Sequence, residues 1–248
     1  MKESKCLPAT GLLLFAILAS PAAFAASVMN QGTTVTTNLL ADLPLYFVEN
    51  QGQMDGAVAF YIQGKGQTIY FTQSGVTISS TARPPVDRLS GDVLPAALSA
   101  TPSGPERWTT KIDFVGARKA PRITGERKTP AVFSYFRGPK SEWKAGLPTY
   151  ASIRYSEVWP GIDVVYSGDG SKLKWNFYIQ PGADPESIGL HYRGTELSLD
   201  QHGNLLMDTP LGSFIDEVPS AYQENTQEPV KVAYGLGRTS TGHESRSA

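Results

Sequence analysis

Strict alternation of apolar and polar residues predicts a β-hairpin in the second half of the chain. Between Lys172 and Ile179 every second residue is apolar, and a period of two places these residues on one face of a strand. The segment 161–166 before it is rich in β-branched and aromatic residues, and residues 167–171 between the two arms form a glycine-rich turn. The apolar face of the second arm consists of Leu173, Trp175, Phe177 and Ile179. We expect this hairpin to organise the core.

Short runs of the same kind recur along the chain, with turn signals roughly every eight to twelve residues. About fourteen such runs lie between residues 45 and 234, and no amphipathic stretch is long enough for a substantial helix. Parallel strands need long crossover connections, usually helices, so the pattern excludes parallel α/β folds. We therefore predict an all-β protein, an antiparallel β-sandwich or irregular barrel of many short strands.

Three polar segments each predict a local structure, two helical turns and one loop. Asp184 followed by Pro185 predicts an N-cap and one helical turn. Ser141 predicts the cap of another turn, over residues 141–144. The basic segment 118–130 contains prolines and an acidic residue and lacks interleaved aromatic residues, so we interpret it as a solvated loop in preference to an anion-binding patch.

The amino terminus has the features of a secretory signal peptide. Lys2 and Lys5 precede the apolar run 11–19, and Ala23-Phe24-Ala25 fits the small-x-small cleavage rule. The apolar run is shorter than the roughly 20 residues that span a bilayer, which disfavours the alternative of an uncleaved anchor. We predict a signal peptide at 1–25, export to the periplasm, cell surface or medium, and no transmembrane segment after cleavage.

Composition predicts the bounds of the domain and of its flexible segments. Residues 26–42 are small and polar and read as a flexible lead-in to a single β-rich domain at 43–236. Within it, residues 80–106 carry five prolines and few aromatic residues, which predicts a disordered insertion. The polar residues 237–248 are expected to form a disordered tail.

Charge and cysteine content exclude several function classes. The formal net charge is −1, so no basic surface for nucleic acid is expected. The single cysteine, Cys6, lies inside the predicted signal, so the mature chain cannot use disulfides or thiolate chemistry. The three histidines share no zinc spacing. We predict no catalytic residues, no cofactor and no metal, and hence no enzyme.

Glu157, Trp159 and Asp163 are the candidate ligand-binding residues. Two carboxylates beside an aromatic residue are typical of carbohydrate sites and of glycosidase pairs. The competing interpretation buries Trp159 in the core and uses Pro160-Gly161 as a turn. A glycan-binding module would instead expose Trp159, Trp143 or Tyr150 on one concave face.

Ser198, Asp200 and His202 alternate along one strand face and combine the residue types of a catalytic triad. The base of a triad lies between the other two groups, whereas here the aspartate does. A hairpin turn around Asp200 and His202 is the better interpretation.

Several ordered motifs carry a resemblance to a known family. They are Phe47-Val48-Glu49-Asn50-Gln51-Gly52-Gln53, Thr149-Tyr150-Ala151-Ser152-Ile153-Arg154-Tyr155, Val158-Trp159-Pro160-Gly161-Ile162-Asp163-Val164-Val165-Tyr166, Pro181-Gly182-Ala183-Asp184-Pro185, Gly203-Asn204-Leu205 with Thr209-Pro210-Leu211-Gly212, and Pro219-Ser220-Ala221-Tyr222-Gln223-Glu224. With these motifs the chain from about residue 45 to 234 resembles a bacterial secreted domain of unknown function found N-terminal to seven-bladed β-propeller-type repeats.

The resemblance implies a secreted β-rich module without an assigned activity. Family members continue through a closing strand and repeats where this sequence stops, which implies a truncated front end or a product that works alone, and an exposed sheet edge. We expect an exported, non-enzymatic structural or interaction module with a protein or glycan partner at the cell surface. The alternative is a carbohydrate-binding module or carbohydrate-active enzyme using Glu157 and Asp163.

Overall fold

The computed structural model describes residues 10–17, 26–30, 33–34, 45–64, 66–82, 106–170 and 172–237, with side chains from residue 45 onward. These residues form nineteen strands and two short 3-10 helices. The strands are β1 (Thr10–Ile17), β2 (Ala26–Asn30), β3 (Thr33–Thr34), β4 (Phe47–Glu49), β5 (Val58–Gln63), β6 (Gln67–Thr72), β7 (Gly75–Ala82), β8 (Glu106–Val115), β9 (Arg122–Tyr135), β10 (Lys144–Trp159), β11 (Ile162–Asp169), β12 (Lys172–Ile179), β13 (Gly189–Arg193), β14 (Glu196–Leu199), β15 (Leu205–Thr209), β16 (Gly212–Asp216), β17 (Pro219–Gln223), β18 (Pro229–Val230) and β19 (Val232–Gly237). The helices are η2 (Lys140–Glu142) and η3 (Pro185–Ser187).

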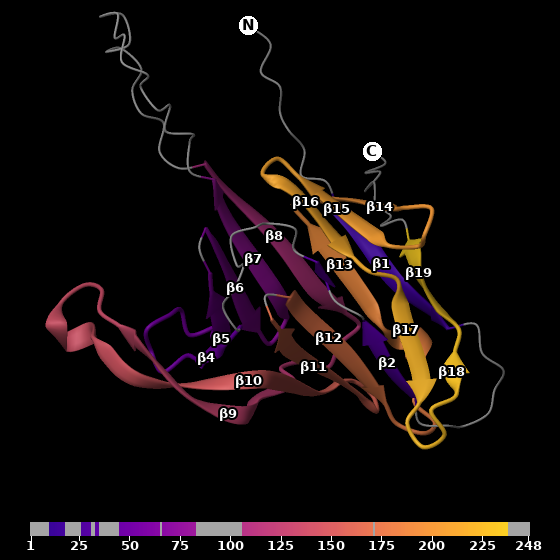
Figure 1. The fold of residues 1–248 in the computed structure, drawn as a ribbon, viewed down its shortest axis with the longest axis horizontal. Coiled ribbons are helices and arrows are strands. Elements are labelled where there is room, and N and C mark those ends of the chain that lie inside the picture. The colour runs from indigo at the N-terminus through magenta and orange to yellow at the C-terminus, as the bar shows by residue number, and fades with distance from the viewer. Residues whose placement is uncertain are drawn as a thin grey trace, which may run out of the picture.

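Every pairing between these strands is antiparallel, which confirms the predicted all-β class. Successive pairings join β4 through β8 to β13, then to β1 and β19. On the other side β10 pairs with β4 and β11, and the sheet continues through β12 and β2 to β17. The result is a curled sheet, a half-barrel with smaller flanking sheets (Figure 1).

The hairpin predicted in the second half of the chain is present as β11 and β12. Its register pairs Ile162 with Ile179 and Tyr166 with Trp175. Trp175, Phe177 and Ile179 are buried, whereas Asn176 and Tyr178 between them are partly exposed. The two-residue period therefore predicted the strand and its buried face, of which Leu173 alone is only partly buried.

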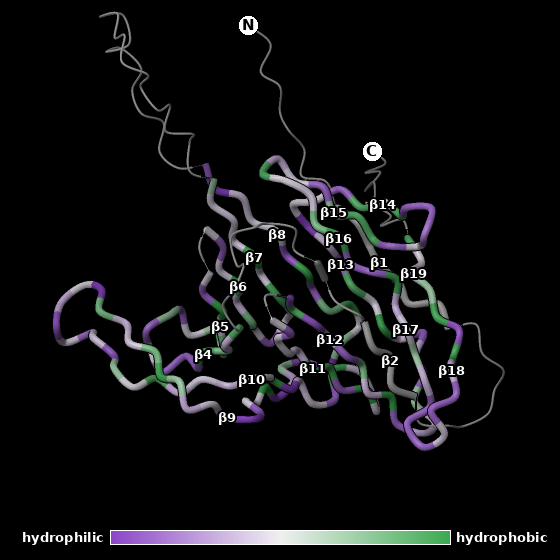
Figure 2. Tube along the Cα trace, viewed as in Figure 1, coloured by the Kyte–Doolittle hydropathy of each residue, from purple (hydrophilic) through white to green (hydrophobic). Residues whose placement is uncertain are grey.

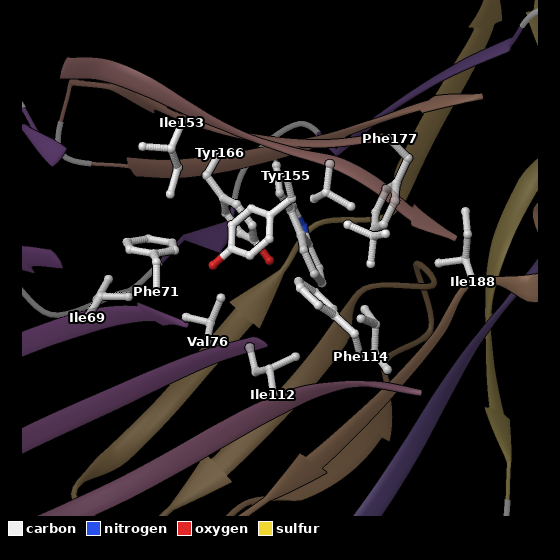
Figure 3. Packing of buried hydrophobic residues seen from close by; sticks show 14 of the residues in the cluster. Ile69, Phe71, Val76, Ile112, Phe114, Ile153, Tyr155, Tyr166, Phe177 and Ile188 are labelled. Carbon is white, nitrogen blue, oxygen red and sulfur yellow. The ribbon is translucent and has the colours of Figure 1, made fainter. Parts of the chain in front are cut away.

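One continuous hydrophobic cluster fills the inside of the curl (Figure 3). Aromatic rings at its centre meet mainly edge to face, an arrangement that favours ring quadrupoles. Phe114 contacts Tyr155 and Trp159 with centroids 5.4 and 5.6 Å apart, and Tyr155 contacts Tyr166 at 5.7 Å. Apolar residues alternate with polar ones along the strands, and the turn between β17 and β18 is strongly hydrophilic (Figure 2).

The segment 118–130, predicted as a solvated loop, instead contributes most of its length to β9. Pairing with β10 runs from Arg122 opposite Ser156 to Tyr135 opposite Lys144. That prediction was wrong because charge and proline content are local signals, whereas the strand is stabilised by a partner more than twenty residues away. Beyond the body of the sheet, residues 129–148 form a curved projection, hereafter the arm (Figure 1).

The two predicted helical turns have different outcomes. η3 begins after Asp184, whose Oδ1 accepts a hydrogen bond from the Glu186 amide at 3.0 Å, and this confirms the predicted N-cap. η2 begins after Pro139 without a side-chain cap, so the prediction that Ser141 caps it was wrong.

The segments predicted to lie outside the β-rich core of the domain contain some strands. Residues 26–30 and 33–34 of the expected flexible lead-in form β2 and β3. Strands β7 and β8 extend into the two ends of the expected insertion, whose residues 83–105 lie outside the described residues, as does the tail 238–248. Of the expected signal peptide only residues 10–17 are described, as β1. In the described part of the chain, no helix has the length and apolar character needed to cross a membrane.

Candidate functional site

Trp159 lies in the core and is only 1% exposed. Its Nε1 donates a hydrogen bond to the Val115 carbonyl at 2.8 Å, and its ring packs between Phe114 and Phe177. Pro160 and Gly161 turn the chain from β10 into β11, with Gly161 at φ 71°. A buried, hydrogen-bonded indole offers no face on which a sugar could stack.

Asp163 fixes a bulge between β10 and β11. The register shifts between Tyr155 and Trp159, and Asp163 Oδ1 accepts a hydrogen bond from the Glu157 backbone N–H at 2.7 Å. Its Oδ2 lies 3.1 Å from Nη1 of Arg154. Both carboxylate oxygens therefore have partners within the fold, as is expected for a residue that closes an irregular strand pair.

Glu157 occupies the bulge with φ 48°, a left-handed conformation that is uncommon for a residue with a side chain. Its carboxylate points away from the core and forms an ion pair with Arg118 at 2.9 Å, in which both side chains are more than half exposed. Glu157 and Asp163 are neighbours through the backbone, while their carboxylates are engaged by different arginines.

The other aromatic residues proposed for glycan binding are separated from Trp159. Tyr150 is half-buried, and its hydroxyl donates to Glu49 at 3.2 Å. Trp143 is 42% exposed on the arm, where its ring contacts Phe136 and its Nε1 donates to the Gly138 carbonyl at 3.2 Å. The structure therefore does not bring the three residues together on one concave face.

A polar cleft that the sequence did not indicate lies between the arm and strands β5 to β8. Its volume is about 310 Å³. Its lining residues are Met54, Gln63, Thr68, Tyr70, Ser79, Thr81, Arg107, Tyr135 and Arg137. We refer to this space as the arginine cleft.

The floor of the arginine cleft is the outer face of four strands. The sheet register places Gln63 opposite Thr68 and Thr68 opposite Ser79, across β5, β6 and β7. Thr81 of β7 is in turn opposite Arg107 of β8. Neighbouring residues alternate to the other face, where Ile62, Ile69 and Ile78 enter the main core, so the polar row follows from the pleat of the sheet.

A second, smaller core holds the arm against this floor. Val48, Tyr61 and Leu147 are fully buried in it, and Phe133 of the arm meets Tyr61 edge to face at 6.4 Å. Tyr70 and Tyr135 pack against the same cluster and also line the cleft. The arm is thereby anchored at its base, which positions Tyr135 and Arg137 beside the outer face of the sheet.

The Asn50 loop contributes Met54 to the cleft. Asn50 Nδ2 donates to the carbonyls of Asp55 and Val58 at 2.9 and 2.7 Å. Its Oδ1 accepts from the Gly52 and Met54 amides at 3.0 and 3.1 Å. Gly52 adopts φ 98°, a conformation that glycine enters without steric cost. The N-x-G-Q motif thus shapes the loop, a structural role.

The cleft is electropositive and rich in hydrogen-bond donors. Arg107 and Arg137 are both exposed, and in the described part of the chain neither guanidinium has a hydrogen bond or ion pair. The lining contains no acidic residue, and it adds two phenols, three hydroxyls and one amide. Arginine binds carboxylate, sulfate and phosphate groups through paired N–H donors. The arrangement is suited to holding an anionic, hydroxylated ligand.

Sequence reasoning missed this site because its residues come from six separate segments between Met54 and Arg137. The only local signal was the alternation of polar residues on β6 and β7. Over the described residues, no group of three or more acidic, histidine or cysteine side chains is arranged to hold a metal ion.

Comparison with known proteins gives one match. Neither the curated proteins nor the solved structures contain a match to this chain. A family model described as a domain of unknown function, DUF7948, matches residues 47–246. The match covers the arginine cleft, the arm and the β10–β11 bulge. The chain therefore belongs to the DUF7948 family of domains of unknown function.

Proposed function

We propose that this protein is an exported, non-enzymatic interaction module that binds an acidic glycan in the arginine cleft. The observation that carries the proposal is the pair of exposed guanidinium groups, Arg107 and Arg137, in a cleft without any acidic residue. A uronate or sulfated sugar supplies both the anion for these groups and the hydroxyls for the surrounding polar side chains. Tyr70 and Tyr135 add aromatic surface beside them.

Export follows from the signal peptide predicted at 1–25, and it would place the module in the periplasm, at the cell surface or in the medium. There, extended acidic polysaccharides are accessible to a cleft of this size. We further propose that the module acts as the N-terminal part of a larger repeat-bearing protein, as the family resemblance implies. In such a protein the cleft would attach the repeats to a surface glycan.

The glycan proposal is tested by calorimetric titration of the purified chain with a uronic acid oligosaccharide and with a neutral oligosaccharide of the same length. We expect binding of the acidic ligand only, weakening as salt is raised. Arg107→Ala and Arg137→Ala are each expected to weaken binding about tenfold, the loss of about 1.4 kcal/mol from a charge-assisted contact.

Arg122→Ala is the matched control, because Arg122 is an exposed arginine on β9 outside the cleft lining. Equal binding of the neutral sugar, or an equal loss in the Arg122→Ala variant, would contradict the proposal. Export is tested separately by the mass of the secreted product, which should begin at Ala26.

A further inference from the structure

Strand β1 lies between two other strands and runs antiparallel to both (Figure 1). Its residues 10–14 pair with all five residues of β13, and residues 12–17 pair with all six residues of β19. β13 pairs on its opposite edge with β8, so it stays in the sheet with or without β1. β1 is therefore the element that joins β19 to the main sheet along its whole length.

All of β1 falls inside the predicted signal peptide. Cleavage after Ala25 would remove β1 and leave β2, which starts at Ala26, as the first strand of the mature chain. β2 has its own partners, because it pairs with β12 and with β17. The mature chain would thus keep the sheet around β2 and lose one internal strand between β13 and β19.

Removal of an internal strand leaves two facing rows of unpaired backbone N–H and C=O groups. Such rows bind an extended segment by completing the ladder, and pockets for alternate side chains supply selectivity. The site can be described by its two edges, Gly189–Arg193 and Val232–Gly237. The strand that occupies it in the full-length chain, TGLLLFAI, is uncharged and free of proline.

Other segments of the mature chain are poor substitutes for this strand. Residues 83–105 contain five prolines, which remove ladder donors. The sequence of residues 238–248, RTSTGHESRSA, contains a single apolar residue, at its end, and residues 35–44 are interrupted by Asn38, Asp42 and Pro44. The remaining strands already have partners in the sheet.

We propose that the space between β13 and β19 is a strand-acceptor site, which in the mature protein takes an apolar, uncharged β-strand of at least six residues from another polypeptide. The strand enters antiparallel to both edges, as β1 does. This inference rests on the part of the proposed function that removes the leader, and it is independent of the arginine cleft. Residues 10–17 hold the site until export, which keeps the two edges covered inside the cell.

The test uses the chain 26–248 and a synthetic peptide of residues 9–18 with a solubilising lysine tag. We expect the peptide to bind with one-to-one stoichiometry and to raise the thermal midpoint. Amide exchange should slow at residues 189–193 and 232–237. A peptide carrying Leu13→Pro should bind at least about tenfold more weakly, because proline removes a ladder donor.

Gly235→Pro in the acceptor chain should also abolish peptide binding, since Gly235 is paired with Leu14. If the chain 26–248 is unfolded alone, refolding with the peptide should restore it. The proposal would be overturned if the peptide failed to bind or to refold the chain, or if the Leu13→Pro peptide bound equally well. Full protection of β19 from amide exchange without peptide, whether in a monomer or in a homodimer, would also overturn it. Retention of residues 1–25 in the secreted product would instead contradict the proposed cleavage of the leader, on which this inference rests.

Discussion

Trp175 shows how one aromatic side chain joins the two arms of the central hairpin to the core. It is 4% exposed, pairs in register with Tyr166 and stacks on that ring with centroids 6.0 Å apart. Phe177, on the same strand, lies 5.5 Å away. Within the part of the chain that the structure describes, the indole Nε1 has no hydrogen-bond acceptor, so the residue stabilises the fold by burial and packing.

Trp175→Ala is therefore expected to lower the free energy of unfolding by about 3–5 kcal/mol, the cost of deleting a large buried aromatic side chain. Trp175→Phe keeps a ring and loses no hydrogen bond, so its cost should be clearly smaller. Urea unfolding followed by circular dichroism measures both. Trp143→Ala, which removes an indole that is 42% exposed, is the control, and an equal loss there would contradict the assignment of Trp175 to the core.

Among the strands, β10 links several parts of the fold. It pairs with β9 along one edge and with β4 and then β11 along the other. Its outer half supports the arm, and its inner half ends in the bulge at Glu157. One strand thus connects the arm to the central hairpin, and the candidate residues Glu157 and Asp163 shape the bulge at its inner end.

Asp163→Ala should destabilise the β10–β11 pair by about 1–3 kcal/mol, because it leaves the Glu157 N–H and Nη1 of Arg154 without their acceptor, while Nε of Arg154 keeps its bond to Glu126. Glu157→Ala should cost less than about 1 kcal/mol, because it removes only an exposed ion pair. Chemical unfolding of the two variants gives the comparison. If Glu157 and Asp163 were a glycosidase pair, the unmodified chain would hydrolyse a glycoside. Both variants would then lose this activity while remaining equally stable.

At the scale of the whole molecule, the curl of the sheet encloses phenol groups as well as hydrocarbon. The hydroxyls of Tyr155, Tyr166 and Tyr192 are buried and have no hydrogen-bond partner among the described residues (Figure 3 shows the first two). Burial raises the pKa of Tyr155 well above its ordinary value, with a smaller contribution from Tyr166. Burial, and then the charge of Asp216, raise the pKa of Tyr192 and of Tyr166 in the same direction.

These shifts predict unfolding in alkali. The folded chain holds these phenolic protons more tightly than the unfolded chain, whose tyrosines ionise near pH 10. Their contribution to stability is therefore complete below about pH 10 and is lost as the pH rises toward the raised pKa values of the folded state. Phenolate absorbance and the unfolding midpoint, recorded against pH, should show the buried tyrosines ionising only together with unfolding.

Tyr192→Phe is the matched variant, since it removes a buried hydroxyl for which the described residues supply no hydrogen-bond partner. It should be neutral or stabilising at neutral pH and should reduce the steepness of alkaline unfolding. Ionisation of every tyrosine at its ordinary pH in a chain that is still folded would contradict the burial of these groups.

The features of the fold that could be predicted are those that depend on local sequence patterns. The β11–β12 hairpin, the Asp184 cap and the turn at Asp200 all follow from residues that lie close together in the sequence. Asp200 Oδ1 accepts from the His202 and Asn204 amides at 2.8 and 2.9 Å, a turn that explains these residues without catalysis. β9 was not predictable in this way, because its polar residues are held by pairing with β10.

The sequence by itself determined the all-β class, the main hairpin and its buried face, because strand period and turn chemistry act over a few residues. Only the tertiary structure decided that Trp159 is core, that Asp163 closes a bulge and that Arg107 and Arg137 share a cleft. The reason is physical: burial and strand pairing depend on which distant segments meet, and one curled sheet brings together residues that no local pattern relates.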